Sequence, residues 1–143
     1  MSQLIISIGR EFGSGGHEIA ERLAKHYELP MYDHNMLREI ANFMNVDTEE
    51  LLAFDESKKH KLFTRTVRGM SNCHATNVAE LQFKFIETKA GVGESFVIVG
   101  RCAETVLKDN ANTVSLFILG DRDAKCQRVM KLYNKNQKEA FAL

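Results

Sequence analysis

The stretch that decides the fold is Ser7–Ala24, SIGREFGSGGHEIAERLA. An apolar run over residues 4–8 overlaps its start and predicts a buried strand. Four glycines follow within residues 9–16, and apolar side chains then recur at helical spacing over residues 17–27. A glycine-rich turn between a strand and a helix offers unpaired backbone N–H groups at the positive end of the helix dipole. The stretch therefore predicts a cradle for phosphate.

The loop departs from the complete phosphate-loop motif, G-x-x-x-x-G-K-[ST], in which lysine contacts the β- and γ-phosphates and the hydroxyl holds magnesium. With Gly15 as the second glycine, Arg10 stands at the first glycine, Gly16 at the lysine and His17 at the hydroxyl. A register that starts from Gly9 also lacks the lysine. We therefore expect the forked guanidinium of Arg10, or a hydrogen bond from His17, to help hold a phosphate.

Other interpretations of this loop stay open from the sequence. A glycine-rich turn can join a strand to a helix without binding a ligand, and Arg10 can be a surface arginine. Glu18, in the first helical turn, would repel phosphate unless it holds a magnesium ion. It can equally serve only to complement the helix dipole.

Composition indicates one soluble domain over residues 1–143. Nineteen basic and nineteen acidic side chains cancel, which gives no overall charge for binding nucleic acid or a membrane surface. The three cysteines form no C-x-x-C pair, and the five histidines have no H-x-x-x-H spacing, so we expect no metal site. No apolar run reaches the ~20 residues of a membrane span. These features together predict a cytoplasmic protein.

Two further apolar runs, residues 95–100 and 114–120, are typical of strands buried on both faces. Helical patterns over residues 34–45 and 122–134 alternate with the strands. This alternation predicts a parallel α/β sheet covered on both faces. Segment 46–91 is predicted to be a helical insertion above the carboxyl edge of the sheet, where open α/β folds bind ligands.

One segment of the chain is strongly basic. It carries Lys58, Lys59, Lys61, Arg65 and Arg68. Arg65 and Arg68 are three residues apart, so on a helix both can reach one anion, which favours a role in binding an acceptor's phosphate. A solvated helical face is the alternative. Binding of nucleic acid is disfavoured because this is one short basic patch on a chain without net charge.

Three segments taken together resemble the cytidylate kinase-like family, a branch of the phosphate-loop (P-loop) nucleoside monophosphate kinases. They are SIGREFGSGGHEIAERLA, LPMYD (residues 29–33) and FVIVGRCAETVL (residues 96–107). The resemblance implies a three-layer α/β/α P-loop NTPase-type core, a small-molecule nucleotide as partner, and phosphoryl transfer from ATP with Mg²⁺. It places the nucleotide-phosphate loop on Gly13, Ser14, Gly15 and Gly16, followed by His17. It also matches Asp33 and Arg101 to residues that hold the acceptor.

The sequence departs from the family pattern at two further places. Cys102 follows Arg101 where cytidylate kinases have an aspartate that recognises the acceptor. The resemblance implies a continuation into an arginine-bearing lid and a last strand, and this sequence ends at Leu143 before those parts. Either the sequence is a fragment or the protein lacks them. The strand at 114–119 would then lie at a sheet edge, ready to pair with a second chain in a homodimer.

The sequence thus predicts a nucleoside monophosphate kinase-like phosphotransferase. It would move the ATP γ-phosphoryl group to a cytidine-like nucleoside monophosphate or a related small phosphate acceptor. Arg10 and Arg101 are the expected catalytic residues, and Asp33, Arg65, Arg68 and Arg101 are expected to bind the acceptor. The alternative is a catalytically inactive nucleotide- or anion-binding regulatory protein with the same fold.

Overall fold

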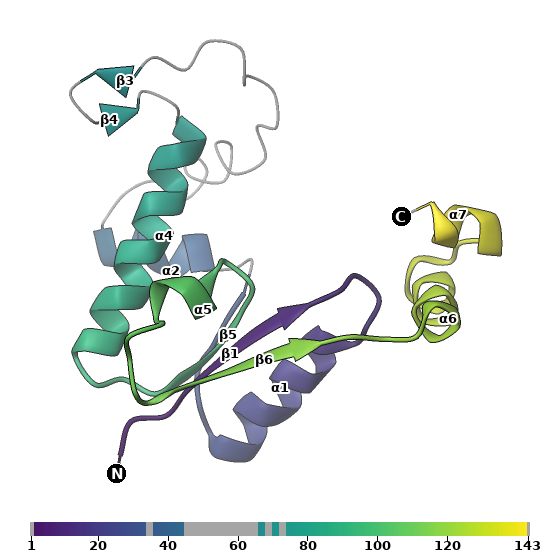
Figure 1. Cartoon of the computed structure of the whole chain (residues 1–143), viewed down its shortest axis with the longest axis horizontal. Helices are drawn as coiled ribbons and strands as arrows, with labels where there is room; N and C mark the ends of the chain where they lie inside the picture. The colour runs from purple at the N-terminus through teal and green to yellow at the C-terminus, as the bar shows by residue number, and fades with distance from the viewer. Residues whose placement is uncertain (1, 34–35, 45–65, 68–69, 72–73, 143) are drawn as a thin grey trace.

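The computed structural model describes residues 2–33, 36–44, 66–67, 70–71 and 74–142. Its centre is a four-stranded sheet with the strand order β2-β5-β1-β6 (Figure 1). The strands are β1 (Ile5–Arg10), β2 (Met31–Tyr32), β5 (Phe96–Val99) and β6 (Thr113–Ile118). All neighbouring pairs in this sheet are parallel, which confirms the predicted α/β class.

The register brings the carboxyl ends of all four strands to one edge of the sheet. Ile5 of β1 is level with Phe96 of β5 and Thr113 of β6, and Tyr32 of β2 is level with Ile98 of β5. Residues that directly follow these strands therefore meet at the same edge. Ligands of open α/β sheets bind at such an edge.

Helices cover the two faces of the sheet, because side chains of a strand alternate between its faces. Helix α1 (Gly16–Tyr27) packs on one face, where Ala20 and Ala24 contact Ile6 and Ile8. Helices α2 (Met36–Met44), α4 (His74–Gly91) and α5 (Ala103–Val106) lie on the other face. There they enclose a second cluster that includes Ile5 and Phe96. The result is the predicted three-layer core.

Strand β6 differs from its prediction, because it is not buried on both faces. Val114 is 47% exposed, Phe117 is 65% exposed, and Leu119 just beyond the strand is 69% exposed. Within the described part of the chain, β6 pairs with β1 on one side and forms an edge of the sheet. An apolar run indicates a strand but does not reveal how many neighbours cover it. The expected edge position is therefore confirmed, whereas the expected burial is wrong.

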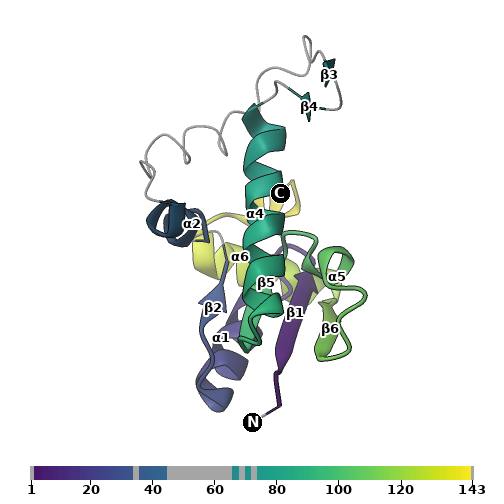
Figure 2. The same cartoon turned by 90° about the vertical axis from the view of Figure 1, so that its left-hand side faces the viewer.

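Segment 46–91 is described only in part, and residues 45–65 lie outside the described residues. The described part holds a short antiparallel hairpin, β3 (Thr66–Val67) and β4 (Met70–Ser71), that the helical pattern did not predict. It lies beyond the N-terminal end of α4 (Figures 1 and 2). The other end of α4 belongs to the core, where Phe85 and Ile86 are buried.

Helix α6 (Arg122–Tyr133) stands beyond the carboxyl ends of β1 and β6 (Figure 1). A short helix, α7 (Gln137–Phe141), follows it and was not predicted. Asn136 begins α7 with a capping box, since its side chain accepts a hydrogen bond from the amide of Glu139, whose carboxylate accepts one from the amide of Asn136. None of the helices in the described ranges is long and apolar enough to cross a membrane.

Candidate phosphate-binding site

The glycine loop between β1 and α1 presents open hydrogen-bond donors. Gly13 and Gly15 adopt left-handed backbone conformations, with φ of 76° and 85°, which only glycine reaches without strain. The amide of Ser14 donates to the carbonyl of Glu11 at 3.2 Å. The amides of Gly15, Gly16 and His17, at the start of α1, have no acceptor among the described residues. These three N–H groups can bind an anion at the positive end of the helix.

Neighbouring side chains pack directly onto the loop glycines. A Cβ on Gly16 would lie 2.6 Å from the Cβ of Arg10, so the stem of Arg10 crosses this position. A Cβ on Gly15 would lie 2.9 Å from the guanidinium carbon of Arg128. Larger residues would therefore displace the loop or the arginines that cover it.

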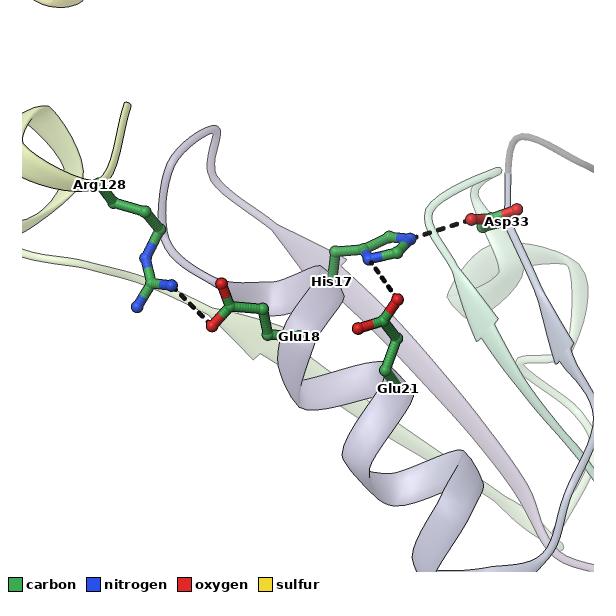
Figure 3. A network of polar contacts seen from close by, with 5 residues as sticks. All are labelled: His17, Glu18, Glu21, Asp33 and Arg128. Atoms are coloured by element: carbon green, nitrogen blue, oxygen red, sulfur yellow. Dashed lines mark hydrogen bonds and ion pairs between the residues drawn. The ribbon is translucent and has the colours of Figure 1, made fainter. Parts of the chain in front are cut away.

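Helix α6 brings two cations to the loop. The ammonium group of Lys125 donates a hydrogen bond to Oε2 of Glu11 at 2.7 Å. Nη1 of Arg128 donates to Oε2 of Glu18 at 2.7 Å (Figure 3). The sequence analysis missed both cations. Their three-residue spacing on the helix that follows β6 was the available signal, because that spacing puts both on one side of the helix.

Arg10, the predicted substitute for lysine, lies at the mouth of the loop. Its side chain is exposed, and no ion pair to it occurs in the described part of the chain. Its guanidinium group is thus available to a ligand, and a catalytic role for it stays a prediction.

His17 contacts a residue at the end of another strand. Its Nε2 lies 2.9 Å from Oδ2 of Asp33, and its Nδ1 lies 3.5 Å from Oε1 of Glu21 (Figure 3). An ionised carboxylate can only accept, so Nε2 donates whenever Asp33 is ionised. The sequence analysis selected His17 and Asp33 separately, and the structure joins them. Glu21 was missed, although its i,i+4 spacing from His17 was visible.

Arg101 follows β5 in an unusual backbone conformation. Gly100, Arg101 and Cys102 all have positive φ angles, of 71°, 60° and 52°. Left-handed non-glycine residues are strained, and such strain clusters at functional sites. This run is at the same sheet edge as Asp33, because β5 and β2 are parallel neighbours. Arg65 and Arg68 lie outside the described residues, so their role in acceptor binding stays a prediction.

An open hollow adjoins the loop on the side of α6. It has a volume of about 350 Å³, within the range of small-molecule pockets. Its lining residues include Phe12, Arg122, Lys125 and Val129. Phe12, from the loop, also stacks on Tyr133 of α6, with the ring centroids 5.8 Å apart.

The residues of the loop fit phosphate groups better than they fit a protein-held metal ion. The three open amides and the two α6 cations suit phosphate oxygens. In the part of the chain that the structure describes, no group of three histidine, cysteine, aspartate or glutamate residues could hold a metal. Mg²⁺ that accompanies a nucleotide is usually held by phosphates and water, with few protein ligands. The site is therefore compatible with a magnesium nucleotide.

The ion pair between Lys125 and Glu11 predicts a pH dependence of stability. The hydrogen bond from Lys125 and a weaker one from the amide of Gly120 hold the pKa of Glu11 below its ordinary value of 4.5. The stabilising contribution is therefore complete well above pH 4.5 and is lost as the pH falls through the lowered pKa. We expect Glu11→Gln to lose less of its melting temperature than the wild type between about pH 5 and about pH 3. The control is Glu87→Gln. The prediction is contradicted if the melting temperature of Glu11→Gln depends on pH as that of the wild type does, or if Glu87→Gln shows the same reduced dependence.

Comparison with known proteins places the chain among kinase-like proteins. The sequence profile of the cytidylate kinase-like family matches residues 5–143. A crystal structure of an uncharacterized protein from Eubacterium ventriosum ATCC 27560 is 42% identical, with a TM-score of 0.72 over 98% of this chain and 68% of that chain.

A kinase and a putative kinase share the fold at lower identity. Shikimate kinase from Bacteroides thetaiotaomicron is 14% identical, with a TM-score of 0.54 over 97% of this chain and 74% of its own. A putative kinase from Chloroflexus aurantiacus J-10-fl is 12% identical, with a TM-score of 0.55 over 94% of this chain and 68% of its own. Among curated proteins, none matches this sequence.

Proposed function

The chain belongs to the cytidylate kinase-like family, and from this premise we propose that it is a phosphotransferase that uses MgATP. Its acceptor would be a nucleoside monophosphate, cytidine-like or related, or another small phosphate compound. The observation that carries the proposal is the open row of amides at Gly15, Gly16 and His17 beside the cations Lys125 and Arg128.

In the proposed reaction, an oxygen of the acceptor's phosphate bonds to the γ-phosphorus of ATP while the bond from that phosphorus to ADP breaks. Catalysis of such transfers relies on positioning and charge neutralisation. The backbone of Gly13, Ser14, Gly15 and Gly16 would hold the phosphates of the donor. The nucleoside of ATP would extend toward the hollow that Phe12 lines.

The positive charge at the donor phosphates would come from α6 and the loop. Arg128 lies against Gly15 and is our first candidate for the role that lysine has in the complete motif. Lys125 and Arg10 would add to it. On the acceptor side, Arg101 would bind the acceptor's phosphate, and Asp33 would orient it. Both residues are positioned at the carboxyl edge of the sheet.

A specific observation also supports the alternative, a nucleotide-binding protein without turnover. Lys125 and Arg128 each already contact a carboxylate, of Glu11 and Glu18 respectively. Such pairs leave little net positive charge at the loop. A bound nucleotide would have to compete with both carboxylates for the cations.

Two measurements separate these functions. A ligand that binds the folded state stabilises it by about 2.7 kcal/mol at a hundred times its Kd. We therefore expect MgATP to raise the melting temperature by several degrees, and a coupled assay to detect ADP release that depends on CMP or another monophosphate. Binding without acceptor-dependent ADP release would select the alternative, and no binding of MgATP or ADP would refute both.

We also propose that the edge of β6 pairs with β6 of a second copy. Residues 113–120, TVSLFILG, contain no charge and no proline, the features that usually protect an edge strand. In an antiparallel pair, the exposed Val114 and Leu116 on one face, and Phe117 on the other, would lie beside side chains of the partner strand. Sedimentation equilibrium should show a dimer that Phe117→Lys dissociates. A wild-type protein that stays monomeric at about 100 μM, a concentration well above the Kd of a specific interface, would refute the pairing.

A further inference from the structure

His17 lies between the two halves of the site. Its main-chain amide is one of the open donors of the glycine loop, while its side chain points away toward the end of β2 (Figure 3). Strand β5 separates β2 from β1 in the sheet, so no hydrogen-bond ladder joins the loop's strand to β2 directly. The contact between His17 and Asp33 crosses this separation.

Asp33 is held firmly on both its main chain and its side chain. The residue is 7% exposed, and a buried carboxylate is costly unless polar partners compensate for its lost hydration. Nε2 of His17 supplies one partner at 2.9 Å. The carbonyl of Asp33 accepts a hydrogen bond from the amide of Met36, at the start of α2. Its carboxylate is thus fixed at the carboxyl edge of the sheet.

The imidazole ring is itself oriented from its other side. Nδ1 of His17 lies 3.5 Å from Oε1 of Glu21, one turn along α1. Glu21 is exposed, and the contact spans the i,i+4 spacing of a helix. A carboxylate beside one ring nitrogen restricts the plane in which the ring lies. The three side chains therefore form a line, Glu21–His17–Asp33, that ends at the acceptor side.

We propose that His17 is a positioning residue. Its imidazole holds the carboxylate of Asp33 in the orientation that receives the acceptor. Because His17 belongs to the glycine loop, it also fixes the position of that carboxylate relative to the donor phosphates. This role rests on the proposed function. It differs from the sequence-based expectation that His17 itself donates a hydrogen bond to the phosphate, because the side chain is already directed to Asp33.

Three substitutions of His17 test the role with matched geometry. The amide nitrogen of glutamine reaches about as far as Nε2, whereas that of asparagine reaches only as far as Nδ1. With CMP as the acceptor probe, His17→Ala and His17→Asn should raise the KM for CMP by about tenfold or more, since small misplacements are costly. Both should leave the KM for MgATP within about twofold of wild type. His17→Gln should restore the KM for CMP, and Glu21→Gln should change it by less than about threefold.

Crystal structures of the same variants give a readout that does not depend on turnover. The carboxylate of Asp33 should keep its orientation in His17→Gln and should adopt a different orientation in His17→Ala. An unchanged Asp33 in His17→Ala would overturn the proposal, as would equal increases of the KM for CMP and for MgATP. If wild-type protein neither binds MgATP nor uses CMP, the proposed function fails, and the orientation of Asp33 still decides whether His17 positions it.

Discussion

Arg128→Ala is expected to lower kcat/KM for MgATP by about 100-fold or more, because removal of one preorganised charge at a transition state typically has this effect. Arg128 is the guanidinium group that lies against Gly15, in a loop without the motif's lysine. A bidentate guanidinium also matches phosphate oxygens better than an ammonium does. Arg128→Lys should therefore recover only part of the loss. Steady-state ADP release and the Kd of MgATP, measured by titration calorimetry, check these expectations.

The control for Arg128 is Lys131→Ala, which removes an exposed cation from the same helix. It should change neither the turnover nor the Kd by more than about twofold, because exposed charges away from the site are weakly coupled to it. Glu18→Gln removes the carboxylate that now binds Arg128, so MgATP should bind more tightly to this variant. If Arg128→Ala and Lys131→Ala behave alike, the charge at the loop comes from another residue, and Arg10 becomes the candidate.

Gly13→Ala is expected to lower the free energy of unfolding by about 2–4 kcal/mol, through backbone strain and overpacking together. Gly13 has a left-handed φ of 76°, and a Cβ there would lie 2.9 Å from Cγ2 of Val129 and 3.1 Å from the carbonyl oxygen of Lys125. The added methyl group must push α6 away from the loop. The displacement would also separate Lys125 and Arg128 from the phosphates, so MgATP should bind at least about tenfold more weakly. Urea unfolding and calorimetry provide both numbers.

Gly93→Ala separates the two causes of this loss. Gly93 also has a left-handed backbone, with φ of 83°, but nothing lies within 4 Å of an added Cβ. This variant should therefore show the strain alone, about 1–2 kcal/mol, and should bind MgATP like the wild type. Equal destabilisation by the two alanines would mean that α6 does not press on Gly13. If Gly13→Ala binds MgATP as tightly as the wild type, the position of α6 does not contribute to phosphate binding.

Local patterns were sufficient for the elements that form the centre of the fold. The apolar run before Gly9, the glycines and the helical spacing from His17 onward predicted β1, the loop and α1 correctly. These features depend on interactions between residues that are close along the chain, such as backbone conformation and the side-chain period. The parallel sheet also followed from the alternation of strands and helices, since a crossover helix is how parallel strands connect.

Contacts between segments that are distant in the sequence could not be predicted from local patterns. Arg128 and Glu18 are 110 residues apart, and Lys125 and Glu11 are 114 apart. Their meeting depends on β6 lying beside β1, and no local pattern encodes the order of strands in a sheet. The exposure of β6 was mispredicted for the same reason, because hydrophobicity reports a preference for burial and not the presence of a neighbour.

The candidate site shows the same division. Residue types and spacing were enough to mark the glycine loop, and the resemblance to the cytidylate kinase-like family added Asp33 and Arg101 as separate candidates. Their common place arises because parallel strands end at one edge, and the bond from His17 to Asp33 arises because α1 packs beside the end of β2. The local sequence therefore indicates which single residues have a chemistry suited to a site. The pairing of charges into a site is a property of the packed chain, since it brings side chains that are distant in the sequence within hydrogen-bonding distance.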